Sequence, residues 1–135
     1  GEQDLAGAIQ LLASSRVEVS VPATPVLLPV SDVNELIAVV REALSNTVRH
    51  GGPQAKSWVL VEDLDPEVVL TVRDNGPGIN TEQLFDAETG GRMGVSRSIR
   101  GRVADLGGTV TLDTGPGRGT QWEVRVRRVR QGALR

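Results

Sequence analysis

Apolar side chains recur along this chain with two different periods, and each period predicts a type of element. Residues 31–50 carry them at helical spacing, so we expect a long amphipathic helix that Gly51-Gly52-Pro53 brings to an end. Helical spacing also predicts a short helix over residues 4–13 and a second long one around residues 95–106, closed by Gly107-Gly108. The apolar residues expected to bury the first long helix are Val33, Leu36, Ile37, Val40, Leu44 and Val48.

The start of the first long helix has a signature of its own. Ser31-Asp32 opens it, and Glu35 follows Asp32 by three residues, as in a capping box. We therefore expect the Asp32 side chain to cap this helix.

Alternating apolar and polar residues predict five strands, over residues 16–21, 58–63, 68–74, 109–113 and 120–127. A turn at Asp65-Pro66 joins the second strand to the third, and Pro22, Pro25 and Pro29 predict an extended connector before the first long helix. The order is helix, strand, helix, two strands, helix, two strands. It predicts an α/β fold, a two-layer sandwich with a mixed or antiparallel sheet covered by helices on one face.

Composition limits the classes of function. The 135 residues fit one domain, with its core over about residues 16–130 and residues 1–15 as an N-terminal helix or the remnant of a preceding domain. The absence of cysteine excludes disulfides and thiolate metal sites. A net charge of -2 and three aromatic residues argue against nucleic acid as a partner. Because no apolar run approaches the ~20 residues of a membrane helix, we expect a cytoplasmic domain without membrane contact.

The first long helix carries a polar stripe. Glu42, Asn46 and His50 are four residues apart, and steps of four drift by only about 40° around a helix. The Asn46 side chain offers a neutral oxygen of the kind that Mg²⁺ accepts, and Glu42 could take a proton from a nucleophile. Arg49 and His50 could meet phosphate oxygens. The alternative is a solvated helix face, which is common for such a spacing when it occurs alone.

The third predicted strand ends in a carboxylate. Val68, Leu70, Val72 and Asp74 share one face, so Asp74 should end the core-facing side and needs a hydrogen-bond donor there. The exocyclic amine of adenine is such a donor. The segment Asn75-Gly76-Pro77-Gly78 allows the backbone to approach a ligand closely. A plain hairpin turn would explain the glycines, but it would not explain Asp74.

Two further glycine-rich segments are candidates for the same pocket. Gly90-Gly91-Arg92-Met93-Gly94 leads into the second long helix, where free N–H groups could hold phosphate, with charge added by Arg92 and Arg97. Residues 115–120 could add the Thr120 hydroxyl and glycine backbone, or could form an ordinary loop. We expect residues 79–93 to be a mobile loop.

Two expectations concern packing. Gly101 within the second long helix should weaken it, which predicts a close approach of another element at that point. Trp122, Val124 and Val126 alternate with polar residues along the last strand and are expected in the core.

Together these residues resemble a known family. Residues 41–50, which read REALSNTVRH, resemble the N box in the ATP-binding domain of sensor histidine kinases, a superfamily shared with gyrase, the mismatch-repair ATPases and the heat-shock chaperone. Residues 74–79 resemble its G1 box, residues 91–108 its G2 box and following helix, and residues 117–120 the start of its final strand. The resemblance covers roughly residues 31–127. It implies the Bergerat fold, with ATP held under a short mobile lid.

The resemblance also implies roles for individual residues. Asn46 would bind Mg²⁺, Asp74 would hold the adenine amine, and Glu42 would be the catalytic base. The full set of residues expected to contact the nucleotide is Asn46, Arg49, His50, Asp74, Asn75, Gly76, Gly78, Ile79, Gly91, Arg92, Gly94, Val95 and Thr120. Arg92-Met93-Gly94-Val95 stands where the family usually has Gly-x-Gly-Leu.

The implied activity is transfer of the γ-phosphoryl group of Mg-ATP to a histidine on a separate dimerisation domain, with a response regulator as the next partner. The sequence of the N box resembles that of nitrate-sensor kinases of actinobacteria. The chain has fourteen arginines and a single lysine, Lys56, which indicates a GC-rich coding bias. His50 is the only histidine, so we expect a catalytic domain cut from a longer, membrane-anchored or free kinase, unable to phosphorylate itself, with Gly1 left from cloning. Alternatives are a serine kinase of the anti-sigma-factor type and a non-catalytic nucleotide-binding or interaction module.

Overall fold

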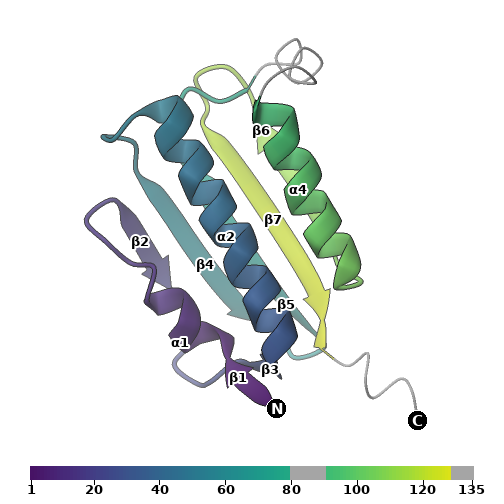
Figure 1. The fold of residues 1–135 in the computed structure, drawn as a ribbon. Helices are drawn as coiled ribbons and strands as arrows, with labels where there is room; N and C mark the ends of the chain where they lie inside the picture. Colours follow the sequence, from purple (N-terminus) through teal and green to yellow (C-terminus); the bar gives the residue numbers. More distant parts are fainter. Residues whose placement is uncertain (80–90, 129–135) are drawn as a thin grey trace.

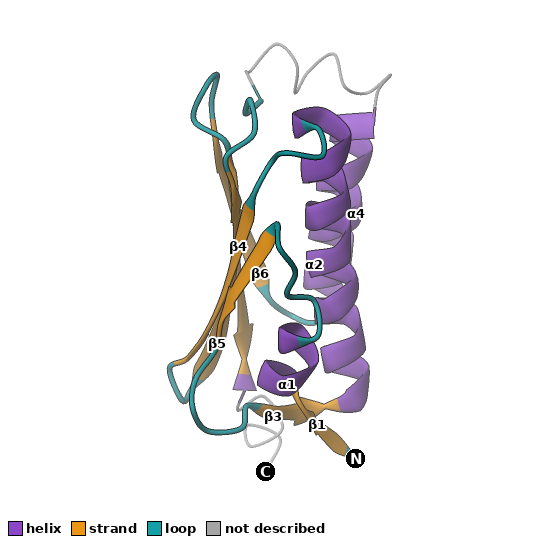
Figure 2. Cartoon of the chain, turned by 90° about the vertical axis from the view of Figure 1, so that its left-hand side faces the viewer, coloured by secondary structure: helices purple, strands orange, loops and turns teal. Residues whose placement is uncertain are grey.

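Two layers make up the structure, a twisted sheet and a layer of helices on one of its faces (Figures 1 and 2). The computed structural model describes residues 1–79 and 91–128, with only the backbone path for residues 91–93. In this part of the chain the main sheet has five strands in the order β2-β4-β5-β7-β6. Their bounds are β2 Val17–Ser20, β4 Ser57–Asp63, β5 Glu67–Asp74, β7 Thr120–Arg127 and β6 Thr109–Thr114. The helices are α1 Leu5–Gln10, α2 Val30–Gly51 and α4 Gly91–Asp105.

The sheet is mixed. β2 pairs with β4 in parallel, and the other neighbouring strands pair antiparallel, so the predicted α/β sandwich is confirmed. β5 and β7 lie side by side in the middle of the sheet, and their register sets Asp74 directly opposite Thr120. This pairing brings the end of one strand and the start of another, far apart in sequence, to one edge of the fold.

A second, two-stranded sheet was not predicted. β1 (Glu2–Asp4) pairs antiparallel with β3 (Leu27–Pro29), at the end of the molecule where the N-terminus lies (Figure 1). Each strand has three residues, which is too short for an alternating pattern to stand out. The Asp4 carboxylate joins the two segments, since its Oδ1 accepts hydrogen bonds from the Ala6 N–H at 3.0 Å and the Val26 N–H at 2.7 Å.

Helix α2 differs from its prediction in two ways. It begins at Val30, after Pro29, which makes no side-chain capping bond, so the predicted capping box is wrong. Asp32 instead lies in the first turn of the helix, where the helix dipole stabilises a negative charge. The predicted apolar stripe is also wrong at its end, because Val48 is 54% exposed. Both the sheet and α4 cover α2, so the buried arc is shifted toward Val39 and Ala43.

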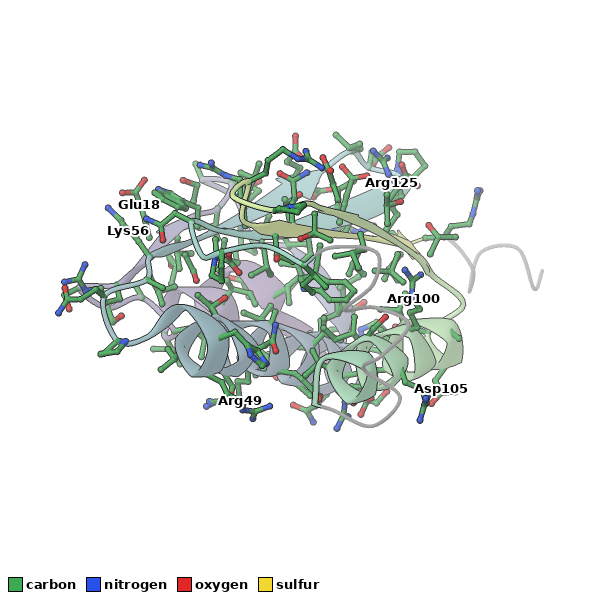
Figure 3. The ribbon with its side chains drawn as sticks, turned by 90° about the horizontal axis from the view of Figure 1, so that it is seen from above. Glu18, Arg49, Lys56, Arg100, Asp105 and Arg125 are labelled. Atoms are coloured by element: carbon green, nitrogen blue, oxygen red, sulfur yellow. The ribbon has the colours of Figure 1, made fainter. Side chains whose placement is uncertain are left out.

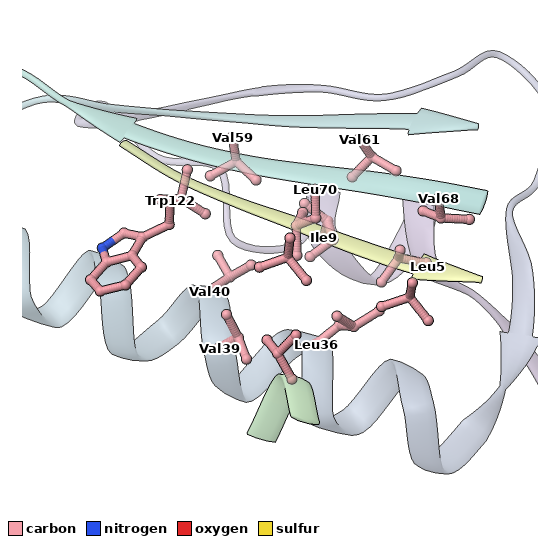
Figure 4. Packing of buried hydrophobic residues seen from close by; sticks show 14 of the residues in the cluster. Leu5, Ile9, Leu36, Val39, Val40, Val59, Val61, Val68, Leu70 and Trp122 are labelled. Carbon is pink, nitrogen blue, oxygen red and sulfur yellow. The ribbon is translucent and has the colours of Figure 1, made fainter. Parts of the chain in front are cut away.

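Most of the core lies between the helices and the sheet. Figure 4 shows Leu36 and Val40 of α2 facing Val59 of β4 and Leu70 of β5, with α1 contributing Ile9. The prediction that three residues of the last strand are buried is confirmed, for Trp122, Val124 and Val126. Since the core is almost wholly aliphatic, its shape depends on backbone arrangement more than on stacking of large rings.

Helix α4 starts earlier than expected. Its first residue is Gly91, so Gly91 and Gly94 belong to the helix itself instead of leading into it. The predicted end is confirmed: Gly107 has a φ of +69°, and the N–H groups of Gly107 and Gly108 bond back to the carbonyls of Ala104 and Val103.

The packing expected at Gly101 is wrong. A Cβ atom there would meet nothing within 4 Å, so this glycine faces open space. Its presence in α4 is therefore not explained by a close approach of another element. Among the described residues, no helix combines the length and apolarity needed to cross a membrane.

Candidate functional site

A crevice opens where the C-terminal half of α2 meets the ends of β5 and β7. It brings together residues from three separate parts of the chain: Asn46, Thr47, His50, Gly51, Asp74, Gly76, Pro77, Gly78, Ile79 and Thr120. Seven of the positions expected to contact a nucleotide are in this set: Asn46, His50, Asp74, Gly76, Gly78, Ile79 and Thr120. Of residues 115–120, only Thr120, the first residue of β7, lines the crevice, so the threonine of this segment lies where it was predicted and the glycine backbone does not.

Asp74 is the most extensively hydrogen-bonded side chain in the crevice. Its Oδ1 accepts from the Gly76 N–H at 2.9 Å and from the Thr120 N–H at 3.2 Å. Its Oδ2 accepts from the Thr47 hydroxyl at 2.7 Å. The expectation that a carboxylate at this strand end has hydrogen-bond donors is confirmed, and in the described residues these donors are three groups of the protein itself.

Two glycines allow segments of backbone to meet behind Asp74. Gly78 has a φ of +76°, and a Cβ atom built on it would stand 2.0 Å from the Gly115 carbonyl oxygen. Gly119 has a φ of +72°, and its Cβ would stand 2.1 Å from the Asp74 carbonyl oxygen. Any side chain at either position would push the crevice wall apart, so the glycines are required by close approach as well as by backbone conformation.

Thr114 joins the crevice walls and was missed by the sequence analysis. Its hydroxyl accepts from the Ile79 N–H at 2.9 Å, and lies 2.9 Å from the Gly119 carbonyl oxygen and 3.1 Å from the Thr120 hydroxyl. The backbone adds a bond from the Gly117 N–H to the Pro77 carbonyl at 2.8 Å. A threonine at the end of a polar strand gives no signal in the sequence, because these partners lie up to 35 residues away.

Asn46 is suited to a magnesium ion. The side chain is 6% exposed, and its Oδ1 atom is buried with no hydrogen-bond partner among the described residues. An unpartnered buried oxygen beside a polar crevice is costly unless a ligand satisfies it. The described residues hold no cluster of three His, Cys, Asp or Glu side chains that could bind a metal alone. That is compatible with Mg²⁺, which commonly takes one or two protein oxygens and fills its other positions with water and phosphate.

The predicted stripe on α2 is divided between two places. Asn46 and His50 line the crevice, whereas Glu42 and Arg49 line a separate groove of about 350 Å³ beside Val95 of α4. The Glu42 carboxylate accepts a hydrogen bond from the Ser98 hydroxyl at 2.8 Å. Figure 3 shows Arg49 on the side of α2 away from the sheet. The drift of the stripe around the helix is therefore enough for Glu42 to face α4 while Asn46 and His50 face the crevice.

The ion pairs around Glu42 connect α2 to α4. Arg102 lies 4.0 Å from the Glu42 carboxylate and 3.1 Å from that of Glu35. All three side chains are between about a quarter and two fifths exposed, so these contacts are partly screened by water. They hold the two helices in register behind the crevice.

The remaining predicted positions have other surroundings. Asn75 lies outside the crevice: its side chain accepts from the Lys56 N–H at 2.8 Å, and its own N–H bonds to the Lys56 carbonyl at 3.1 Å. Gly94 is exposed on α4, and Val95 is buried in the core. The side chain of Arg92 and most of the predicted mobile loop, residues 80–90, lie outside the described part of the chain.

The crevice is narrow. Its cavity volume is about 10 Å³, enough for about one water molecule. A purine ring is far larger, so binding one requires the walls to move apart. Residues 76–79 form the wall of the crevice that belongs to no helix or strand. Separate hydrogen bonds hold this wall, such as those of Pro77 and Ile79, instead of a continuous ladder.

Comparisons with known proteins agree on one family. The profile of the histidine kinase-, DNA gyrase B- and HSP90-like ATPases matches residues 31–130. Sensor histidine kinase LiaS of Bacillus subtilis is 32% identical over 93 residues, which make up 69% of this chain and 24% of LiaS. Sensor protein VraS of Staphylococcus epidermidis is 29% identical over 92 residues, 68% of this chain and 25% of VraS. The chain thus spans about a quarter of the length of these curated relatives.

Solved structures with the same fold include histidine kinase domains. The histidine kinase domain of the blue-light activated kinase EL346 from Erythrobacter litoralis superposes with a TM-score of 0.69 at 25% identity, covering 96% of this chain and 60% of that one. The catalytic domain of histidine kinase ThkA gives a TM-score of 0.71 at 16% identity, covering 95% and 96% of the two chains. At the lower identity the likeness concerns the fold alone.

Proposed function

Because the chain belongs to the histidine kinase-, DNA gyrase B- and HSP90-like ATPase family, as an ATP-binding catalytic domain of the histidine kinase type, we propose that it transfers the γ-phosphoryl group of ATP to a histidine on a separate dimerisation domain. The observation that carries the proposal is the pairing of Asp74 and Asn46 in one crevice. One offers a carboxylate oxygen to a base, and the other offers a buried, unpartnered amide oxygen to a metal.

Asp74 reads the adenine base in this proposal. Its Oδ1 is occupied by two backbone N–H groups, so the oxygen left for a ligand is Oδ2, which can accept from the exocyclic amine. Gly76, Gly78 and Ile79 form the wall against which the base would lie, and Thr120 is joined to this wall through the Thr114 hydroxyl, which contacts both Ile79 and Thr120.

Asn46 would hold Mg²⁺ through its Oδ1 atom. When bound, Mg²⁺ offsets the negative charge of the phosphates and helps to orient the group that is transferred. This chain mainly positions the two ligand-binding side chains. Helix α2 holds Asn46 on one side of the crevice, and β5 holds Asp74 on the other. His50, Arg49, Gly91, Arg92, Gly94 and Val95 remain the proposed phosphate contacts, and Asn75 a proposed support of the loop at Gly76.

Glu42 is the proposed catalytic base, and its surroundings set a condition on that role. Its Oε1 atom accepts from the Ser98 hydroxyl and stands near Arg102, so a proton from the attacking histidine would go to the other carboxylate oxygen, Oε2. We expect Glu42→Gln to retain ATP binding and to lower phosphoryl transfer to the dimerisation domain by about a hundredfold or more, the typical loss for removal of a general base.

Further parts of the proposal concern the whole protein. The sequence 41–50 supports a kinase of the nitrate-sensor type, and the arginine bias supports an actinobacterial source. We propose residues 1–135 as one ATP-binding domain that works on the cytoplasmic side, where ATP is available, with a phosphoacceptor dimerisation domain and a response regulator as partners. Since His50 is the only histidine and lines the crevice, the isolated chain should not label itself.

Calorimetric titration with a non-hydrolysable ATP analogue and Mg²⁺ tests the proposal. We expect saturable one-to-one binding that Asp74→Asn weakens at least a hundredfold, because the amide turns a donor toward the base amine or loses its backbone donors. Asp113→Asn is the matched control, since Asp113 is an exposed carboxylate paired only with Arg118 at 3.4 Å among the described residues. Absence of binding in the wild type would favour a non-catalytic module instead.

A further inference from the structure

The second oxygen of the Asp74 carboxylate has a single protein partner among the described residues, the hydroxyl of Thr47. The two atoms are 2.7 Å apart, and Thr47 is only 4% exposed. Thr47 follows Asn46 directly in α2, so the side chain that touches the base-reading carboxylate and the proposed metal ligand belong to the same helical turn. No role for Thr47 followed from the sequence pattern.

The Thr47 hydroxyl has one proton and two acceptors within reach. The Ala43 carbonyl oxygen lies at 3.1 Å, and the Asp74 Oδ2 atom at 2.7 Å. The carbonyl is also positioned to accept the ordinary helical bond from the Thr47 N–H, whereas the carboxylate is charged and nearer. The proton is therefore donated to Asp74, and the Ala43 contact is secondary.

We propose that Thr47 is a positioning residue for base selectivity, which holds the Asp74 carboxylate so that the crevice accepts a purine with an exocyclic amino group and rejects one with an oxygen at that place. This inference rests on the proposed function and adds a residue to it. With Oδ1 satisfied by Gly76 and Thr120 and one side of Oδ2 satisfied by Thr47, the carboxylate offers one acceptor in one direction. An amino group matches this acceptor, and a carbonyl oxygen meets it with repulsion.

Without the Thr47 hydroxyl, the Asp74 Oδ2 atom no longer has a protein donor that fixes which of its lone pairs faces the ligand. Oδ1 stays bound to the Gly76 and Thr120 N–H groups, but Oδ2 then needs a second donor, which is water once the crevice is open. A carboxylate bound to water discriminates less between an amine and an oxygen, because the water can turn either a proton or a lone pair toward the ligand. Loss of the hydroxyl should therefore affect the amino-bearing base specifically.

The test compares ADP with purine riboside 5′-diphosphate, which lacks only the exocyclic amine, and with inosine 5′-diphosphate, which carries oxygen there. Titration calorimetry with Mg²⁺ gives each dissociation constant for the wild type, Thr47→Val and Thr47→Ser. Valine keeps the shape of the side chain and removes the hydroxyl, and serine keeps the hydroxyl. Thr47→Ala serves as a second hydroxyl-free variant if circular dichroism shows that Thr47→Val is unfolded.

We expect the wild type to prefer ADP over the amine-free nucleotide by about tenfold or more. Thr47→Val should weaken ADP binding about three- to tenfold and the amine-free nucleotide less than about twofold, because the change in ADP binding has the size of the net contribution of one ordinary hydrogen bond. Thr47→Ser should restore the preference. Thr114→Val is the control, because this hydroxyl supports Ile79 and Gly119 without touching Asp74, so it should weaken both nucleotides alike.

The outcomes separate the inference from the function on which it rests. Equal weakening of all three nucleotides by Thr47→Val, or no weakening of any, would overturn the inference while leaving the ATP site intact. If the wild type binds ADP and the amine-free nucleotide equally well, the role of Asp74 in reading the amine fails, and the role of Thr47 with it. If the wild type binds none of the three, the proposed function itself is refuted.

Discussion

Gly78→Ala should be one of the most damaging single-methyl changes in the crevice. The residue has a φ of +76°, and the new Cβ atom would stand 2.0 Å from the Gly115 carbonyl oxygen and 3.0 Å from that of Gly119. Both contacts are with backbone, so no side chain can rotate away to relieve them. The strand-connecting loop of residues 115–119 must shift by about 1.5 Å to restore an ordinary contact distance.

Gly117→Ala provides the matched comparison. Gly117 lies in the same loop with almost the same φ, +75°, but a Cβ atom on it would meet nothing within 4 Å. Its cost is the left-handed conformation alone, about 1–2 kcal/mol. Gly78→Ala carries that cost and also the overpacking, which adds about 1–3 kcal/mol. The difference between the two variants therefore measures the close approach that shapes the crevice wall.

Urea denaturation, followed by circular dichroism and by the fluorescence of Trp58 and the buried Trp122, gives the free energy of unfolding of each variant. We expect Gly78→Ala to be less stable than Gly117→Ala by about 1–3 kcal/mol and to lose nucleotide binding, while Gly117→Ala retains it. Equal destabilisation by the two substitutions would refute the reasoning, since it would mean that the loop moves aside without cost.

Three further predictions concern stability. Gly101→Ala should raise the free energy of unfolding by about 1 kcal/mol, because the helix gains propensity and the new methyl group meets open space; a lower melting temperature would contradict this. Leu70→Ala should cost about 2–5 kcal/mol in urea denaturation, since Leu70 is 1% exposed at the centre of the sheet, and a loss below 1 kcal/mol would mean that the core collapses around the cavity. Burial raises the pKa of Asp63, but hydrogen bonds from the Asp65 N–H and the Arg128 guanidinium, together with the charge of Arg128, lower it by more. The pKa of Asp63 therefore lies below the usual 3.8. The stability from this group is then present above about pH 4 and lost as the pH falls through the lower folded pKa, so the melting temperatures of wild type and Asp63→Asn should converge in acid; a constant gap from pH 7 to pH 2 would rule this out.

Much of the fold follows from periodicity alone. The spacing of Leu36 and Val40 requires a helix with one buried side, and the alternation from Val68 to Asp74 requires a strand with one buried face. That alternation also places a carboxylate at the end of the core-facing side, which is why Asp74 could be identified before any contact was known. Local chemistry is enough here, because burial of each side chain depends on its phase within its own element.

The partners of each polar side chain could not be read in the same way. Glu42, Asn46 and His50 share a stripe in sequence, yet Glu42 contacts Ser98, 56 residues away, because α4 packs on that side of α2. The Thr47 hydroxyl meets Asp74 across 27 residues, and Thr114 supports Ile79 across 35. The short sheet of β1 and β3 likewise depends on pairing between segments that carry little pattern of their own.

The sequence by itself determined that the described chain has three helices, the order in which the five strands of the main sheet follow along the chain, and the two residues, Asn46 and Asp74, on which the proposed site rests. Only the tertiary structure decided that β5 lies beside β7, that Thr47 and Thr120 satisfy the carboxylate, and that Gly101 faces open space. The physical reason is range. Periodicity and turn chemistry act over a few residues, whereas a hydrogen bond in the crevice depends on how distant segments pack, which no local pattern encodes.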